Sequence, residues 1–242
     1  MKNVDLQSFA DADVLAQRVA TLWLDEIAVA ERAGKPHCVA LSGGRITQKF
    51  FASAVEQARA RELSFGKVHF FWADERCLPP TDPESNFKMA NERLFAPLKI
   101  SESQIHRLRG EEVPEIAAKQ ASAELVKIAG LGPDGLPILD LIFLGMGEDG
   151  HVASLFPGKS AGTDPKEIFS TCQNSPKPPP KRITLSYAAI ASARKVWVLA
   201  SGGGKEAALR ESLSEGGKTP LGRVIKSRSG IGIFTDIAVT PL

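Results

Sequence analysis

Residues 140–158 read DLIFLGMGEDGHVASLFPG, and this stretch carries most of the information about architecture and chemistry. Its first part, 140–144, is a short apolar run typical of a buried strand, and glycines after it place flexible backbone beside Asp149 and His151. A histidine titrates near neutral pH, so it can accept a proton in one step and return it in the next. Asp149 can orient the ring or hold its charged form. The stretch therefore predicts a strand that ends at an acid–base site.

Apolar runs of this kind alternate with amphipathic segments along almost the whole chain. Because most of the runs are continuously apolar, they predict a mostly parallel open sheet with helices on both faces. The proline-rich segment 175–181 is interpreted as a loop within one domain that spans 1–242. Strands are expected at 37–41, 68–73, 140–144, 182–186, 195–201 and 231–234, and helices at 11–33, 47–61, 86–95, 114–129, 205–213 and 220–226.

Composition excludes several classes of protein. The chain has 242 residues, 43% of them hydrophobic, and a net charge of +2, so it is neither disordered nor basic enough to suggest a nucleic-acid partner. No apolar run is long enough to span a membrane, and the first residues lack the apolar core of a signal peptide. Three cysteines without paired spacing suit a reducing compartment, with Cys38 and Cys172 as buried apolar residues. These features predict a cytoplasmic protein.

A second group of residues follows the strand at 37–41. Gly43 and Gly44 allow a turn whose N–H groups point at one place, and the start of the next helix favours an anion there. Arg45 adds a positive charge. The alternative is an ordinary tight turn between a strand and a helix.

A third group, Asp74, Glu75 and Arg76, comes directly after the strand at 68–73. Three ionisable residues at such a place are expected at the strand end or in the loop. The two carboxylates can accept bonds from sugar hydroxyls, and Arg76 can hold a carboxylate or an oxyanion. The alternative is a solvated loop with an internal ion pair.

A fourth group contains two cations. Arg182 opens the strand at 182–186, and Lys205 follows a glycine turn at the expected start of a helix, where a cation can reach a phosphate. Lys205 as a merely solvated lysine is the alternative. The sequence has no group of residues with metal-ligand spacing, so a required metal is not expected.

These motifs together resemble the 6-phosphogluconolactonase family over nearly the whole chain. Besides residues 144–158, they are LSGG at 41–44, ADER at 73–76, SN at 85–86, RITLS at 182–186 and the glycine turn before Lys205. The resemblance implies a Rossmann-like fold shared with glucosamine-6-phosphate deaminases. It also implies hydrolysis of 6-phosphoglucono-1,5-lactone, a small sugar-phosphate lactone, in the oxidative pentose phosphate pathway without a cofactor.

Two details distinguish the chain within this resemblance. Asp149 and Arg76 favour the lactonases, because the related deaminases usually have asparagine and tyrosine at these places. The first turn departs from the usual Ser-Gly-Gly-Ser-Thr-Pro, because Arg45, Ile46 and Thr47 replace the last three residues. Contacts from the glycine backbone should survive this change, whereas the side-chain hydroxyl at 45 is replaced by a charge.

The resemblance also suggests a phosphate site. We expect the phosphate among the N–H groups of Gly43 and Gly44 and the side chains of Arg45, Arg182 and Lys205. The expected protein is a monomer or a weak homo-oligomer that binds neither nucleic acid nor membranes.

The reacting end of the substrate is expected beside His151, which takes a proton from the attacking water and returns it to the ring oxygen. Arg76 would stabilise the oxyanion, and Asp74 and Asn86 would position hydroxyls or the water. Gly43, Asp74, His151 and Lys205 should therefore meet in one cleft of a single sheet.

Two other functions remain open at this point. An amino-sugar phosphate deaminase or isomerase would use Asp74 as a base on carbon. A non-catalytic sugar-phosphate sensor would normally have a DNA-binding segment, and none is visible in the sequence.

Overall fold

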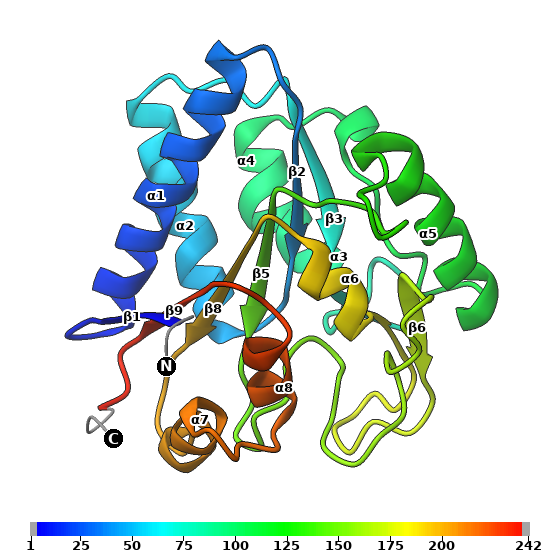
Figure 1. The fold of residues 1–242 in the computed structure, drawn as a ribbon. Helices are drawn as coiled ribbons and strands as arrows, with labels where there is room; N and C mark the ends of the chain where they lie inside the picture. Colours follow the sequence, from blue (N-terminus) through cyan, green and yellow to red (C-terminus); the bar gives the residue numbers. More distant parts are fainter. Residues whose placement is uncertain (1–3, 239–242) are drawn as a thin grey trace.

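The computed structural model describes residues 4–238, and its centre is a sheet of parallel strands (Figure 1). The strand β2 is buried along its whole length, as is typical of a strand covered on both faces. In spatial order the six strands are β1 (Val4–Ser8), β9 (Ile231–Thr235), β8 (Lys195–Ala200), β5 (Leu141–Gly145), β2 (His37–Leu41) and β3 (Val68–Trp72).

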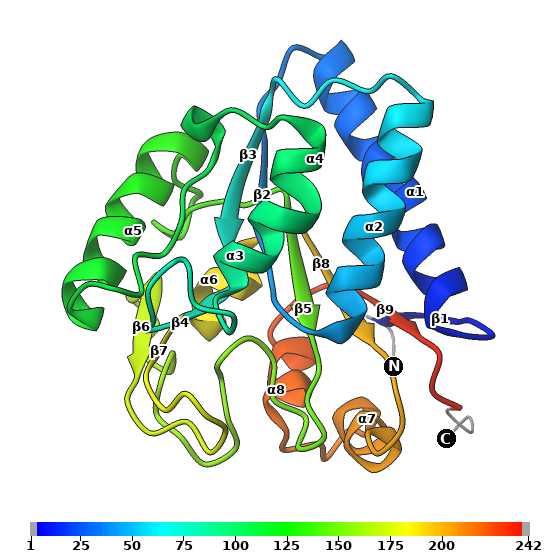
Figure 2. The ribbon, with the colours of Figure 1, turned by 180° about the vertical axis from the view of Figure 1, so that it is seen from behind.

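Helices cover both faces of this sheet. Figures 1 and 2 show α2 and α4 in front of one face and α6 and α8 in front of the other. The helices are α1 (Ala12–Arg32), α2 (Arg45–Ala60), α3 (Asn86–Ala90), the π-helical turn η1 (Asn91–Phe95), α4 (Ala96–Leu98), the 3₁₀ turn η2 (Glu102–Gln104), α5 (Pro114–Ala129), α6 (Tyr187–Ser192), α7 (Glu206–Leu213) and α8 (Pro220–Lys226).

An aromatic cluster joins α1 and α2 to the centre of the sheet. The ring centroids of Trp23 and Phe50 are 5.4 Å apart, and Phe143 on β5 lies 4.6 Å from Phe50 and 5.6 Å from Trp23. These distances fit the tilted and edge-on contacts that aromatic rings prefer. Because Phe143 is part of the cluster, the end of β5 that leads toward Asp149 and His151 is held firmly.

A second, smaller sheet corrects the expectation of a single sheet. It consists of β4 (Asp74–Arg76), β7 (Arg182–Leu185) and β6 (Phe169–Cys172), paired antiparallel in the order β4-β7-β6. Only Ala73 separates β3 from β4, and its N–H and C=O bond Leu41 O and Leu185 N, each at 2.7 Å. The chain therefore leaves the parallel sheet at this residue, and the strand expected at 182–186 pairs with β4 instead.

Most of the other expected elements are present. The helices at 114–129 and 220–226 have the predicted bounds, whereas the helix expected at 86–95 contains the π-helical turn η1. The strands β1 and β6 and the helix α6 are additions that the sequence pattern does not predict. Within residues 4–238, no helix combines the length and the apolar character needed to cross a membrane.

The strand order reverses between β2 and β5. After β3 the chain passes back over β2 and forms β5 on its other side, with Val39 opposite Leu141 and Ala40 opposite Ile142. The connections after β2 and β5 then diverge to opposite faces, which opens a crevice at the carboxyl ends of these strands. The glycine turns at 43–44 and 145–147 lie at this crevice.

Candidate active site

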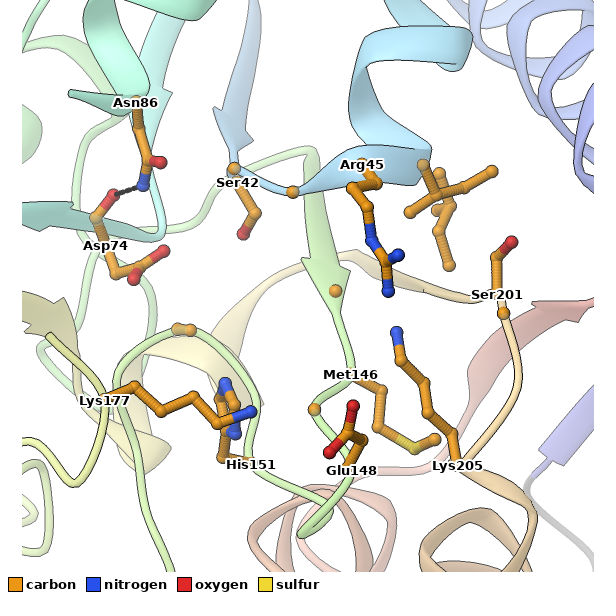
Figure 3. A pocket seen from close by; sticks show the side chains of 18 of the residues that line it. Ser42, Arg45, Asp74, Asn86, Met146, Glu148, His151, Lys177, Ser201 and Lys205 are labelled. Carbon is orange, nitrogen blue, oxygen red and sulfur yellow. Dashed lines mark hydrogen bonds between the residues drawn. The ribbon is translucent and has the colours of Figure 1, made fainter. Parts of the chain in front are cut away.

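A cavity of about 530 Å³ lies at the carboxyl ends of β2 and β5, between the two sheets (Figure 3). Gly43, Asp74, His151 and Lys205 all line it, so the expected convergence on one cleft is confirmed. The other expected residues in its wall are Gly44, Arg45, Arg76, Asn86 and Arg182, whereas Asp149, also expected to bind the substrate, is not in the wall and contacts His151 instead.

One side of the cavity is suited to an anion. Gly44 is the N-cap of α2 with φ of 117°, and no side chain caps this helix, so its first N–H groups are open to a ligand. Arg45 and Lys205 point toward each other from opposite walls (Figure 3). Burial lowers the pKa of Lys205, and the charge of Arg45 lowers it further. An anion between the two cations would relieve their repulsion.

Gly43 and Asn86 bring the second sheet against the first turn. A Cβ on Gly43 would lie 2.0 Å from Asn86 Oδ1, so only glycine allows this approach. The Asn86 amide donates to the Asp74 carbonyl at 2.9 Å. Asn86 thus joins the glycine turn to β4, and its side chain remains in the cavity wall.

The opposite side of the cavity holds His151. Its Nδ1 lies 2.5 Å from Asp149 Oδ1, and its ring packs on Phe156 with centroids 4.6 Å apart. A Cβ on Gly147 would lie 2.0 Å from His151 Cε1, so the missing side chain makes room for the ring. Because an ionised Asp149 accepts the Nδ1 proton, Nε2 of the neutral ring is left as the basic nitrogen. Among residues 4–238, Nε2 has no hydrogen-bond partner.

The charge states of this pair follow from burial and from each other. Burial lowers the pKa of His151, and the hydrogen bond and charge of Asp149 only partly oppose the change. Partial burial of Asp149 favours its neutral form, but the hydrogen bonds and the charge of His151 prevail and lower its pKa. The pair is therefore a neutral imidazole oriented by a carboxylate, which is the state that a general base requires.

Asp74 and Arg76 contribute an acidic and a basic group to the same wall. Asp74 is 5% exposed, and its Oδ2 accepts a bond from Ser154 Oγ at 2.7 Å. Arg76 donates from one terminal nitrogen to the Glu84 carbonyl at 2.5 Å. Its Nε is buried without a hydrogen-bond partner in the part of the chain that the structure describes.

Glu75 corrects the expectation for this segment. It is 2% exposed, does not line the cavity, and accepts bonds from the N–H groups of Arg76, Asn86 and Phe87 at 2.7–2.8 Å and from Ser85 Oγ at 3.1 Å. Burial raises the pKa of Glu75 despite these bonds. Its carboxylate therefore holds the start of α3 and does not meet a sugar hydroxyl. The alternation of a strand puts Asp74 and Glu75 on opposite faces, which explains their different roles.

Arg182 lies in the cavity wall, but apart from the two other expected phosphate ligands. Its guanidinium donates to the carbonyls of Lys177, Pro178 and Pro179 at 3.0–3.2 Å. Its backbone pairs with Arg76 in the second sheet, whereas Arg45 and Lys205 point toward each other in Figure 3. Its donors are thus used largely to hold a loop.

Sequence reasoning missed Lys177, whose side chain also lines the cavity. The prolines of the segment 175–181 indicate a rigid loop and draw attention away from the lysine among them. The position of this lysine, just before the strand that contains Arg182, is the sequence feature that could have indicated its place in the site. Within residues 4–238, no group of three or more His, Cys, Asp and Glu side chains could hold a metal ion.

Comparison with known proteins connects this geometry to a family. The family model for glucosamine-6-phosphate isomerases/6-phosphogluconolactonase matches residues 10–231. A 6-phosphogluconolactonase from Mycobacterium tuberculosis is 34% identical over 222 residues, which cover 89% of this chain and 87% of that protein.

Solved structures show the same fold. The 6-phosphogluconolactonase from Trypanosoma brucei is 25% identical with a TM-score of 0.83, and the match covers 97% of each chain. A glucosamine-6-phosphate deaminase is 19% identical with a TM-score of 0.81 over 96% of each chain, a likeness of fold alone.

Proposed function

Because this chain belongs to the glucosamine-6-phosphate isomerase/6-phosphogluconolactonase family, we propose that it hydrolyses 6-phosphoglucono-1,5-lactone to 6-phosphogluconate. This reaction belongs to the oxidative pentose phosphate pathway. The observation that supports it most directly is one cavity with an Asp149–His151 pair on one side and the cations Arg45 and Lys205 on the other. Such a cavity suits a substrate with a phosphate at one end and a reactive carbonyl at the other.

The phosphate end is anchored first. The open N–H groups at the start of α2, at Gly43 and Gly44, and the charges of Arg45 and Lys205 surround the place where the phosphate binds. Charge-assisted hydrogen bonds from such groups are about twice as strong as neutral ones. Arg182 donates to three loop carbonyls, so its contribution to the phosphate is smaller than the sequence suggests.

The reaction is a water-mediated ester hydrolysis. His151 Nε2 takes one proton from a water whose oxygen bonds to C1 of the lactone, and a tetrahedral oxyanion forms. As the oxyanion collapses, the bond between C1 and the ring oxygen breaks, and His151 returns the proton to that oxygen. The new carboxylic acid then releases its own proton to solvent, which gives the carboxylate product.

Other side chains support these steps. Asp149 keeps the ring of His151 in the required tautomer and stabilises the imidazolium. Arg76, whose buried Nε has no hydrogen-bond partner within residues 4–238, would stabilise the oxyanion. Asp74 and Asn86 orient the water or the sugar hydroxyls. A serine or cysteine nucleophile is unnecessary, because the ring ester already reacts with water.

The decisive experiment is a hydrolysis assay with freshly generated lactone at slightly acidic pH, where spontaneous opening is slow. We expect rapid opening that persists after prolonged treatment with a chelator. Release of ammonia from glucosamine 6-phosphate, without lactone hydrolysis, would contradict the proposal. So would activity that chelation abolishes and one divalent ion restores.

Location and assembly belong to the same proposal. All three cysteines are unpaired, which suits a reducing cytoplasm. We expect the active protein to be a monomer or a weak homo-oligomer. Gel filtration at assay concentration tests this point.

A further inference from the structure

The loop at 175–181 places a second cation beside the reacting end of the cavity. The side chain of Lys177 extends from this loop into the cavity (Figure 3). Its ammonium group has no hydrogen bond or ion pair within residues 4–238. A lysine that reaches into a cavity without a protein partner is available for a ligand.

The backbone of this loop is held in place. Arg182 donates to the carbonyls of Lys177, Pro178 and Pro179, and the hydroxyl of Ser175 donates to the Lys177 carbonyl at 2.7 Å. The N–H of Lys177 donates back to Ser175 Oγ at 3.1 Å. The prolines restrict the backbone further. The point from which the Lys177 side chain starts is therefore fixed, although the side chain itself is long.

Lys177 belongs to the reacting side of the cavity. It enters with His151 and Asp74, whereas Arg45 and Lys205 meet on the other side (Figure 3). Its positive charge helps to lower the pKa of both His151 and Lys205, so its place on the His151 side rests on the geometry in Figure 3. Two other cations line the cavity away from Lys205: Arg76, proposed above for the oxyanion, also bonds the Glu84 carbonyl, and Arg182 bonds the loop carbonyls.

We propose that Lys177 binds the oxygens on C1 of the substrate, and that Arg182 is a positioning residue that holds the Lys177 loop. C1 is neutral in the lactone and becomes negative in the tetrahedral oxyanion and in the carboxylate product. A cation beside C1 therefore binds the oxygens on C1 more strongly as the reaction proceeds. Such an interaction raises kcat more than it lowers KM. This inference rests on the proposed lactone hydrolysis.

Two ligands that differ only at C1 test the assignment without any turnover. 6-Phosphogluconate has a carboxylate there, and glucitol 6-phosphate has a neutral hydroxymethyl group. In Lys177→Met we expect the Kd for 6-phosphogluconate, measured by calorimetry, to rise about 3- to 30-fold, because an exposed charge-assisted bond is lost. The Kd for glucitol 6-phosphate should change by less than about twofold. The matched control is Lys181→Met, which removes an exposed lysine of the same loop outside the cavity.

Kinetics add a second measurement. The kcat of Lys177→Met for the lactone should fall about 3- to 30-fold with little change in KM. Equal weakening of both ligands would make Lys177 a phosphate ligand and overturn the inference. Unchanged binding of both ligands would overturn it as well. If the parent protein binds 6-phosphogluconate but opens no lactone, the proposed function fails while the role of Lys177 at C1 is still measured.

The role of Arg182 is tested by coupling. Arg182→Lys keeps a charge but cannot reach three carbonyls in the same geometry. If Arg182 acts through Lys177, adding Arg182→Lys to Lys177→Met should lower kcat by less than about twofold further, whereas Arg182→Lys alone lowers it severalfold. Independent, multiplying effects would show that Arg182 contacts the substrate itself. Should Arg182→Lys fold poorly, the ligand comparison with Lys177→Met still decides the main assignment.

Discussion

Substitution of Gly147 by alanine should disable proton transfer while the phosphate end stays intact. A Cβ at 147 would lie 2.0 Å from His151 Cε1, 2.1 Å from its Nδ1 and 2.9 Å from Asp149 Oδ1. Because carbon atoms in contact are about 3.5–4.0 Å apart, the imidazole must move by roughly 1.5 Å. A misplacement of about 1 Å can cost about 100-fold in rate. We therefore expect kcat to fall at least about 100-fold, toward the limit of about 10⁴-fold for losing the acid–base group.

The assay compares catalysis with anchoring in the same variant. Lactone hydrolysis gives kcat, and calorimetry with glucitol 6-phosphate gives the affinity of the phosphate end, which should stay within about threefold of the parent. Gly203→Ala is the matched control, because a Cβ there would meet no atom within 4 Å and its φ is not in the left-handed region. The backbone at Gly147 also lies outside that region, so the expected loss comes from contact with the ring and not from backbone strain.

Two results would refute this reasoning. If Gly147→Ala keeps kcat within about threefold, the position of the His151 ring does not limit the reaction. If affinity for glucitol 6-phosphate falls as much as kcat, the substitution disturbs the whole cavity and says nothing specific about the histidine.

Three further predictions concern the site and the second sheet. His151→Ala should lower kcat about 10²- to 10⁴-fold, whereas Lys205→Ala should raise KM about 10- to 150-fold and behave like the parent on unphosphorylated gluconolactone. If His151→Ala affects only KM and Lys205→Ala affects only kcat, the roles assigned to the two residues are reversed. Because the pKa of His151 is lowered, its neutral form persists below pH 6.5. The acidic limb of kcat/KM should therefore have its midpoint below 6.5, and a midpoint above that value would contradict the lowered pKa. Glu75→Ala should lower the free energy of unfolding, measured by urea titration, by about 2–4 kcal/mol, because four donors lose their acceptor. A loss under about 0.5 kcal/mol would show that water replaces the carboxylate.

Much of the site is predictable because parallel strands impose a common edge. The glycine turns at 43–44 and 145–147 both follow apolar runs, and strand ends of this kind meet at one crevice. The meeting of Gly43, His151 and Lys205 can therefore be inferred from the sequence alone. The Asp149–His151 pair is predictable too, since the two residues are separated by a single glycine.

The second sheet cannot be inferred from local pattern. β4 has three residues, all of them charged, and β7 is apolar enough to look like another parallel strand. Only their mutual pairing, Asp74 with Thr184 and Arg76 with Arg182, places them outside the main sheet. The bonds from Arg182 to the carbonyls of residues 177–179 are local in sequence, but they depend on the conformation of the loop, which composition and spacing do not specify.

The second sheet carries only some of the residues proposed to act on the substrate, because His151 follows β5 of the parallel sheet. The proposed phosphate site lies at the start of α2 and at Lys205 before α7, whereas Asp74, Arg76 and the Lys177 loop are attached to β4 and β7. Redesign of the second sheet can therefore leave the proposed phosphate site and His151 unchanged. Substitutions confined to β4, β7 and the 175–181 loop should change which sugar phosphates react, while the phosphate site stays intact.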